Sequence, residues 1–527
     1  MVIQLRGHAG LRNFPNIAYD TGPPGSIVPS FEDLMSTIRL TRDFPRTFWV
    51  ANVMELFERA AYYGLNSVLA VYLTGSKDSG GLGFGEQAVG FLQGTVYALT
   101  YILPILGGAL ADRYGYRRML LVAFSLLATG YFAAGQMSAY GMVFLALLVM
   151  ATGAGLFKPI ISGTIARTTD ERTSSLGFGI YYWMINLGAF LAPLVVSWLK
   201  GFSWRWVFMA SALYTGAMLV PTLALFRDPP RPTSTKSLNE VLRGAAEVLG
   251  DARFMLMIVV YSGFWILYFQ NFGTVLWYLR DFVDPTPVNA AVTSWLHAIG
   301  LPWTFSFDAE HVTVINAGMI ILLQVVVSRI VKDLPALPTM ITGMAIGGLG
   351  FLCLASSTHA WVFILGIAVF SIGEMTAHPK YYSFVGLTAP QDRKAVYTGY
   401  AFLYGVFGSL LGSNVGALLY EKMLKPAIGT PRAGAQARIF WGLFALLDIA
   451  ACVGLFLFAR RFGEDNEATR RRATAIMSGV YGLIALLGLG FLVSALGSEQ
   501  VQVKTAVQAT IFLAIGAGGF WINRRSR

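Results

Sequence analysis

An otherwise apolar segment near the start of the chain carries three charged residues. They are Glu55, Glu58 and Arg59, and Tyr62 and Tyr63 follow them. In the middle of a membrane each such charge costs about 2.5–3.5 kcal/mol if it is unpaired and faces lipid. Spacings of three and four residues place the charged groups on one helical face. This face must look into a protein interior or a wet cavity, where acid and base can pair.

A further cation, Lys158, lies in the middle of another apolar segment, directly before Pro159. Proline frees a backbone carbonyl and bends a helix, so this position can adapt. The carboxylates Glu55 and Glu58 can balance Arg59 and Lys158. A carboxylate that takes up a proton would release a cation for an anionic substrate group, which couples proton binding to substrate binding. The alternative is a salt-bridge network that only holds two helices together.

The composition is typical of a polytopic helical membrane protein. Of 527 residues, 55% are hydrophobic and 13% are charged, and the mean hydropathy is +0.59. The net charge of +11 comes from residues scattered through short loops. This pattern follows the positive-inside rule and argues against a nucleic-acid partner.

Several classes of chemistry have no support in the sequence. Cys353 and Cys452 both lie in apolar segments, so they predict packing and no disulfide framework. The five histidines have no metal-binding spacing. No phosphate-binding Gly-x-x-x-x-Gly-Lys-Ser/Thr loop occurs. We therefore expect no enzyme, no metal site and no ATP-driven pump.

Fourteen segments are long and apolar enough to cross a membrane. They run approximately 48–73, 88–110, 119–137, 141–165, 175–199, 206–226, 254–279, 312–330, 340–358, 362–388, 396–420, 439–459, 475–496 and 506–522. We expect an all-α polytopic membrane protein with two six-helix bundles and an extra C-terminal helix pair. Two similar bundles around one cavity are a transporter architecture.

The loops between these segments define the expected domains and their orientation. With the N-terminus inside, 27 Lys and Arg residues fall on the inner side, nine fall on the outer side and three lie within spans. This asymmetry predicts that both termini are cytoplasmic. The expected parts are a tail (1–47), the first bundle (48–226), a cytosolic linker (227–253), the second bundle (254–460), a loop (461–474) and the extra pair (475–523), which we expect at the periphery.

The loop after the second span reads Gly107-Gly108-Ala109-Leu110-Ala111-Asp112-Arg113-Tyr114-Gly115-Tyr116-Arg117-Arg118. It resembles the cytosolic motif of the major facilitator superfamily. Asp112 and Arg113 would then belong to a gating latch that pairs across the two halves and favours one side of alternating access. The alternative is a positively charged turn with no gating role.

The spans contain a second set of motifs. They are Glu55-x-x-Glu58-Arg59 with Tyr62-Tyr63-Gly64, Lys158-Pro159, Tyr182-x-x-x-Asn186-x-Gly188, Ile315-Asn316 and Gly373-Glu374. These resemble the signatures of the proton-coupled oligopeptide transporter family, a branch of the major facilitator superfamily. The resemblance covers about residues 48–460 and leaves the last two spans outside.

The resemblance implies a symporter that imports di- and tripeptides with protons by alternating access. It implies no cofactor apart from the coupling proton. Glu374 opposite the cations would make a bipolar site that suits the two charged ends of a peptide. The implied substrate-binding residues are Arg59, Tyr63, Tyr101, Lys158, Asn186, Asn316 and Glu374. The expected proton-coupling residues are Glu55, Glu58, Arg59, Glu374 and His378.

Four positions depart from the family pattern or fall outside it. Phe269 stands where the family has an acidic residue in the seventh span. His378 lies four residues after Glu374, so it is a candidate proton carrier or a hydrogen-bond partner of that acid. Lys380 either adds a cation to the cavity or extends toward the cytosol. Asp448, in the middle of the twelfth span, has no assigned role.

These departures leave alternatives open. The chain could instead carry another small anion or a drug-like solute, or act as a transporter-like nutrient sensor. We expect a monomer in the plasma (inner) membrane, with the lipid bilayer and short peptides as its partners.

Overall fold

The computed structural model describes residues 41, 44–229, 238–496 and 503–525. Most of the predicted N-terminal tail, 1–47, lies outside these residues. Within them the chain forms helices and no strand. Thirteen of these helices are long and apolar enough to cross a membrane. Helix α2, Arg46–Thr74, is also of spanning length with 29 residues, although Glu55, Glu58 and Arg59 make it more polar. The expected all-α membrane architecture is therefore confirmed.

The first helical group, α2–α8, contains the predicted first bundle. After α2 it consists of α3 (Glu86–Tyr114), α4 (Tyr116–Gln136), α5 (Tyr140–Arg167), α6 (Ser174–Lys200), α7 (Trp204–Ala217) and α8 (Leu219–Ala224). Proline lies inside α3, α5 and α6, where it interrupts the backbone hydrogen bonding that keeps a helix straight. Helix α9, Leu238–Gly250, follows in the predicted linker.

The second helical group, α10–α18, contains the predicted second bundle. Its seventh span breaks into α10 (Ala252–Tyr268), η2 (Phe269–Phe272) and α11 (Thr274–Phe282). The predicted outward loop 280–311 contains a helix, α12 (Thr286–Ala298), with Trp295 exposed. The rest of the group is α13 (Glu310–Val331), α14 (Ala336–Ser356), α15 (Ala360–Thr388), α16 (Lys394–Tyr400), α17 (Leu403–Leu419) and α18 (Ala433–Phe462).

The two groups meet mainly through two helix pairs, α3 with α17 and α6 with α13. Small residues allow the first of these approaches. A Cβ atom on Gly90 of α3 would collide with the Ser413 carbonyl of α17, and one on Gly94 would lie 3.1 Å from the Ser409 carbonyl. Membrane helices gain contact area in this way where small side chains line both surfaces.

The extra C-terminal pair consists of α19 (Glu467–Leu496) and α20 (Val503–Arg525). The pair contacts more than one helix of the main body. Phe512 of α20 packs in a cluster with Ala98 of α3 and with Val406 and Leu410 of α17. Gln508 of α20 is fully buried and reaches the Thr95 hydroxyl of α3 at 3.4 Å. The expected peripheral pair therefore touches both helical groups.

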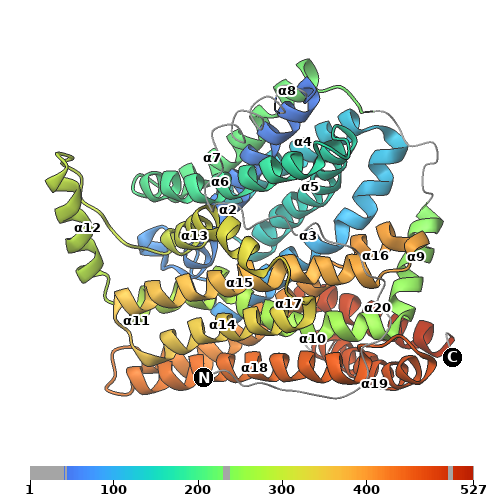
Figure 1. The fold of residues 1–527 in the computed structure, drawn as a ribbon. Coiled ribbons are helices and arrows are strands. Elements are labelled where there is room, and N and C mark those ends of the chain that lie inside the picture. Colours follow the sequence, from blue (N-terminus) through green and yellow to red (C-terminus); the bar gives the residue numbers. More distant parts are fainter. Residues whose placement is uncertain (1–40, 42–43, 230–237, 497–502, 526–527) are drawn as a thin grey trace, which may run out of the picture. The chain divides into compact units, whose positions relative to one another are not determined.

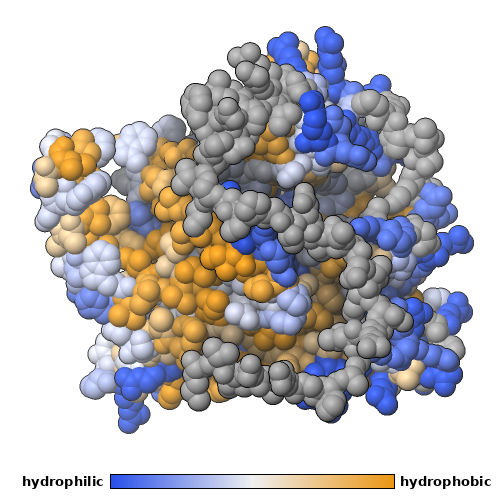
Figure 2. All heavy atoms as spheres, viewed as in Figure 1, coloured by the Kyte–Doolittle hydropathy of each residue, from blue (hydrophilic) through white to orange (hydrophobic). Residues whose placement is uncertain are grey.

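The helix ends carry different charges on the two sides. We call the side where α2 begins and α3 and α18 end the basic end, and the other side the opposite end. Figure 1 shows α9, α16 and the end of α20 together on one side of the view, and α12 projecting on the other. In Figure 2 hydrophobic residues cover the middle of this face and hydrophilic ones gather on the side of α9 and α16. This distribution suits a membrane-spanning body.

Candidate functional site

Helix α2 places its three charged residues as the sequence predicts. Glu55, Glu58 and Arg59 are all buried, with exposed fractions of 2%, 0% and 6%. The Arg59 Nε atom lies 2.5 Å from Glu58 Oε2 and 3.4 Å from Glu55 Oε1. Glu55 Oε2 and Glu58 Oε1 have no hydrogen-bond partner in the described part of the chain. One guanidinium therefore pairs with two carboxylates, and one oxygen of each carboxylate stays available for a proton.

Lys158 makes a different set of contacts from those the sequence predicts. Its Nζ atom donates to the Thr100 carbonyl at 3.4 Å and lies 5.1 Å from the Tyr101 ring centre and 6.0 Å from that of Tyr62. Among the residues with described placement, no carboxylate lies within 4 Å of it. The sequence predicts that the two acids balance both Arg59 and Lys158. In the structure the two acids pair with Arg59 alone, and Lys158 lies between aromatic rings.

Helix α6 approaches α2 closely at this cluster. A Cβ atom on Gly188 would lie 2.7 Å from the Leu56 carbonyl and 3.2 Å from the Arg59 Cβ atom. The same helix carries Asn186, whose side-chain amide donates to the Tyr182 carbonyl of its own helix at 2.9 Å. The carbonyl oxygen and the second N–H of the Asn186 side chain therefore remain available to a ligand.

The second helical group supplies the acid predicted to face the cations. Asn316 of α13 donates from one nitrogen to Glu374 Oε2 and to the Ser371 hydroxyl of α15, each at 3.0 Å. The family resemblance implies that Asn316 binds substrate. In the structure its amino group orients Glu374, which leaves its side-chain oxygen for a ligand.

His378 lies among aromatic side chains. Its ring centre is 5.0 Å from Trp265, 5.1 Å from Tyr382 and 5.7 Å from Tyr404. Its Nδ1 atom lies 3.5 Å from the Tyr261 hydroxyl. Although His378 and Glu374 lie on one helical face, no hydrogen bond joins them among the described contacts. A role for His378 in proton transfer stays a prediction.

The predicted binding and proton-coupling side chains, except that of Glu58, line one cavity of about 780 Å³ between the two helical groups. The predicted residues on its wall are Glu55, Arg59, Tyr63, Tyr101, Lys158, Asn186, Asn316, Glu374 and His378. Glu58 does not line the cavity but pairs with Arg59, which does. The structure thus brings the predicted binding and proton-coupling residues together around a space large enough for a small ligand.

Aromatic residues make up much of the wall that the sequence did not assign. They include Phe178, Tyr181, Tyr182, Trp265, Tyr268, Phe272, Tyr382, Phe402 and Tyr404. One of them, Tyr182, belongs to a motif that carries the family resemblance, four residues before Asn186. A charged residue in an apolar segment is unusual and therefore points to a site. An aromatic residue there can line a cavity or pack in the core, so the sequence does not distinguish the two.

Phe269, which replaces the family's acid, joins the two groups through aromatic contacts. Its ring centre lies 5.5 Å from Tyr97 in a stacked arrangement and 6.1 Å from Tyr101 edge to face, both on α3. Its side chain is buried. An apolar contact therefore occupies the position where the resemblance leads us to expect a charged one.

Asp448 of α18 lies outside the cavity. Its carboxylate faces Gly348 of α14 and lies 3.8 Å from the Cys452 sulfur, and its Oδ1 atom has no hydrogen-bond partner among the described residues. The structure gives this residue no functional assignment.

Lys380 makes a structural contact that differs from both of its expected roles. Its Nζ atom donates to the carbonyls of Lys332 at 3.0 Å and Leu334 at 2.7 Å, just beyond the end of α13. The side chain is 8% exposed and does not line the cavity. It is neither a cavity cation nor a snorkelling one, because it satisfies the carbonyls at the end of a helix.

We expect Lys380→Met to destabilise the protein without changing substrate affinity. The substitution removes the hydrogen bonds that a charged ammonium donates to two carbonyls near the end of α13, so the free energy of unfolding should fall by about 1–3 kcal/mol. Thermal unfolding in detergent measures this loss, and the Lys380→Arg variant should retain most of the stability. A raised KM with unchanged stability would place Lys380 in the binding site instead.

The predicted latch residues lie within the first helical group. Asp112 accepts a hydrogen bond from Arg167 of α5 at 2.8 Å and one from Tyr116 at 3.3 Å. Arg113 is exposed and lies over the Tyr114 ring. In this conformation Asp112 pairs within its own half, contrary to the expected pairing across the halves. Its part in gating stays a prediction.

Ion pairs between the two groups occur at the opposite end in the part of the chain described. Lys200, at the end of α6, pairs with Asp308 and lies 2.8 Å from Glu310 of α13. Lys425 lies 2.8 Å from Glu86 of α3. The cavity wall, by contrast, continues toward the basic end through residues such as Gly399 and Phe402. Ion pairs therefore join the two helical groups at the opposite end.

Lys200→Gln should weaken this closure. Glu310 is fully buried, and losing its cation leaves a buried unpaired charge, which costs about 3–5 kcal/mol. Spin labels at Phe202 and Trp303, both exposed on the two sides of the contact, should report a longer distance as the major population.

The control for that measurement is Lys422→Gln. Lys422 is exposed at the same end of the protein and forms no ion pair within 4 Å among the described residues, so the change should leave the closure intact. An unchanged distance distribution in Lys200→Gln would show that this ion pair does not hold the opposite end closed.

Comparison with known proteins places the chain in a family. The family model of the Major Facilitator Superfamily matches residues 51–413. The peptide transporter YePEPT of Yersinia enterocolitica is 31% identical over 194 residues, which are 36% of this chain and 37% of that protein. Dipeptide and tripeptide permease B of Shigella dysenteriae is 24% identical over 434 residues, 70% of this chain and 86% of the permease.

Solved structures show the same fold at lower identity. A peptide transporter POT crystallised with sulfate has a TM-score of 0.65 and 19% identity, over 80% of this chain and 99% of that one. The nucleoside transporter NupG has a TM-score of 0.62 and 16% identity, over 78% and 99%. The resemblance to peptide transporters found in the motifs is thus confirmed. The chain belongs to the major facilitator superfamily.

Proposed function

We propose that the protein imports di- and tripeptides together with protons by alternating access. The observation that carries this proposal is the charge arrangement of the cavity. One helical group supplies Arg59 and Lys158, and the other supplies Glu374. A peptide has a carboxylate for the first pair and an ammonium for the acid, so its two ends match the two sides.

The order of binding follows from the contacts of the two cations. Lys158 is free of carboxylates within 4 Å in the described part of the chain, whereas Arg59 is shared by Glu55 and Glu58. The substrate carboxylate meets Lys158 first. Protonation of Glu58 weakens the ion pair between Glu58 and Arg59. Arg59 then binds the substrate carboxylate together with Lys158.

The basic end is the cytosolic end in this proposal, as the positive-inside rule requires. Both termini then lie in the cytoplasm, and the protein spans the plasma (inner) membrane as a monomer. The ion pairs at the opposite end close the outer side, so the structure corresponds to an inward-facing state. Asp112 and Arg113 would form their contact across the halves only in the outward-facing state.

Competition for uptake into proteoliposomes under an inward proton gradient tests the substrate class. We expect di- and tripeptides to reduce uptake of a labelled dipeptide, and single amino acids and nitrate to leave it unchanged. Failure of every peptide to compete would remove the substrate assignment.

A second candidate is transport of another small solute. Phe269 supports it, because this chain lacks the acid that the peptide-transporter pattern has there, and the fold is shared with a nucleoside transporter. Adding nucleosides and small organic anions to the same competition panel separates the two candidates.

A further inference from the structure

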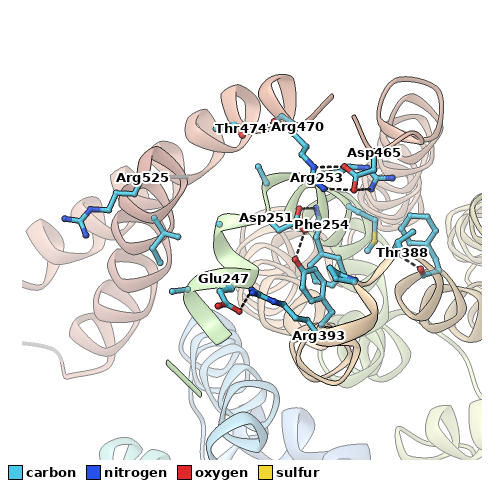
Figure 3. Close-up of a pocket in the computed structure, with 18 of the residues that line it drawn as sticks. Glu247, Asp251, Arg253, Phe254, Thr388, Arg393, Asp465, Arg470, Thr474 and Arg525 are labelled. Carbon is cyan, nitrogen blue, oxygen red and sulfur yellow. Dashed lines mark hydrogen bonds and ion pairs between the residues drawn. The ribbon is translucent and has the colours of Figure 1, made fainter. Parts of the chain in front are cut away.

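A second cavity lies at the basic end, away from the substrate cavity. Its volume is about 610 Å³. Its wall combines the linker helix α9, the basic ends of α10, α15, α16 and α18, and the extra pair α19–α20. Figure 3 shows how residues from these elements surround the space.

The charged part of the wall is rich in arginine. It contains five arginines and three acids: Arg243, Arg253, Arg393, Arg470 and Arg525, with Glu247, Asp251 and Asp465. Five positive and three negative charges leave an excess of two positive charges.

Each acid already has a partner. Glu247 lies 2.7 Å from Arg393. Asp251 accepts hydrogen bonds from the Tyr397 hydroxyl at 2.8 Å and the Phe254 N–H at 3.0 Å. Figure 3 shows these contacts as dashed lines. The acids are thus occupied and do not cancel the remaining arginines.

The third acid, Asp465, binds two arginines. It accepts hydrogen bonds from Arg470 at 2.7 and 2.8 Å, and Arg253 lies 3.8 Å from it. The hydrogen bonds from Arg470 lower the pKa of Asp465, so it is charged at neutral pH. Arg243 and Arg525 have no carboxylate within 4 Å in the described part of the chain, and both are exposed at the rim.

The deeper part of the wall is apolar. Phe254, Met257, Phe384, Phe458 and Ile522 line it. They belong to the ends of membrane-spanning helices, so the cavity lies where the bilayer meets water. Basic pockets between helices at the cytoplasmic membrane surface bind anionic lipid headgroups, and an apolar wall suits the first part of an acyl chain.

We propose that this cavity binds an anionic phospholipid, with the phosphate at Arg243 and Arg525 and an acyl chain against the apolar wall. The bound lipid would join α9 and the α19–α20 pair to the second helical group. It would also contact an element that lines the substrate cavity, because α16 offers Tyr397 to this site while Gly399 and Phe402, the latter just after α16, line the substrate cavity.

Lipid binding to the full chain in detergent tests the proposal, with phosphatidylglycerol as the probe and phosphatidylcholine as the neutral lipid. We expect phosphatidylglycerol to bind more tightly and to slow hydrogen exchange in α9 and α16. The double variant Arg243→Gln/Arg525→Gln should weaken phosphatidylglycerol binding roughly 30-fold, because each arginine near a membrane surface contributes about a fivefold gain in affinity.

The matched control is Arg461→Gln/Arg472→Gln, which removes two nearby exposed arginines that do not line the cavity. It should bind phosphatidylglycerol as the parent does. A third variant, Ala246→Phe, fills the cavity without changing charge and should also weaken binding, which keeps the test valid if the double variant folds poorly.

Three results would overturn the proposal. The first is equal binding of the two lipids, and the second is equal loss of binding in the double variant and its control. The third is competition by inorganic phosphate or glycerol phosphate at the same concentration as phosphatidylglycerol, which would show a site for a soluble anion. The assay measures binding alone, so its outcome does not depend on whether the protein transports peptides.

Discussion

Glu58→Gln is expected to abolish peptide accumulation driven by a pH gradient while leaving exchange of peptide across the membrane intact. Glutamine has the shape of the protonated acid but cannot release a proton, and it no longer holds Arg59 by charge. With a gradient of one pH unit and one proton per peptide, coupled transport accumulates peptide about tenfold, whereas uncoupled transport reaches a ratio of about one. Accumulation and counterflow in proteoliposomes measure the two activities.

The control for this result is Glu464→Gln, an acid-to-amide change in an exposed loop. It should accumulate peptide as the parent does. Loss of both accumulation and counterflow in Glu58→Gln would indicate structural damage, which a lowered melting temperature would reveal. Full accumulation in a well-folded Glu58→Gln protein would exclude Glu58 from proton coupling.

Lys158→Gln should weaken binding of peptides that have a free C-terminal carboxylate. Lys158 is the cavity cation without a nearby carboxylate in the described residues, so its charge is available to the substrate. A hydrogen bond between charged groups contributes about 1.5–3 kcal/mol, so KM for dialanine should rise about 10- to 150-fold. Uptake at a fixed gradient over a range of dialanine concentrations measures the change.

Two comparisons make this test specific. Dialanine amide lacks the carboxylate, so its inhibition constant should be the same for the parent and for Lys158→Gln. Lys380→Met removes another cation from an apolar segment, but one that does not line the cavity, and should leave KM unchanged. An equal loss of affinity for dialanine and its amide would show that Lys158 acts on the structure of the site and not on the carboxylate.

The sequence predicted the charged part of the site well, for a physical reason. Charges in apolar segments are costly, so Glu55, Glu58, Arg59, Lys158 and Glu374 had to meet in a polar space. The structure places all but Glu58 on one cavity wall and Glu58 beside Arg59. The helical spans were predictable for the same reason, because hydropathy decides which segments the membrane admits.

The contacts of individual side chains could not be predicted in this way. Lys380 and Lys158 look alike in sequence, each a cation in an apolar segment, yet one binds carbonyls beyond the end of α13 and the other faces the cavity. Helical spacing places His378 near Glu374, but the rings of Trp265 and Tyr382 surround it. The partner of each side chain depends on which helices pack beside it, and the local sequence does not specify that packing.

The most direct test of proton coupling is the accumulation ratio of a labelled dipeptide in proteoliposomes, measured at several imposed pH gradients with the membrane potential clamped. For each proton carried with the peptide, the ratio should rise about tenfold per pH unit. A ratio that stays at about one for every gradient would contradict the account, because it would show that the cluster around Arg59 binds substrate without drawing energy from protons.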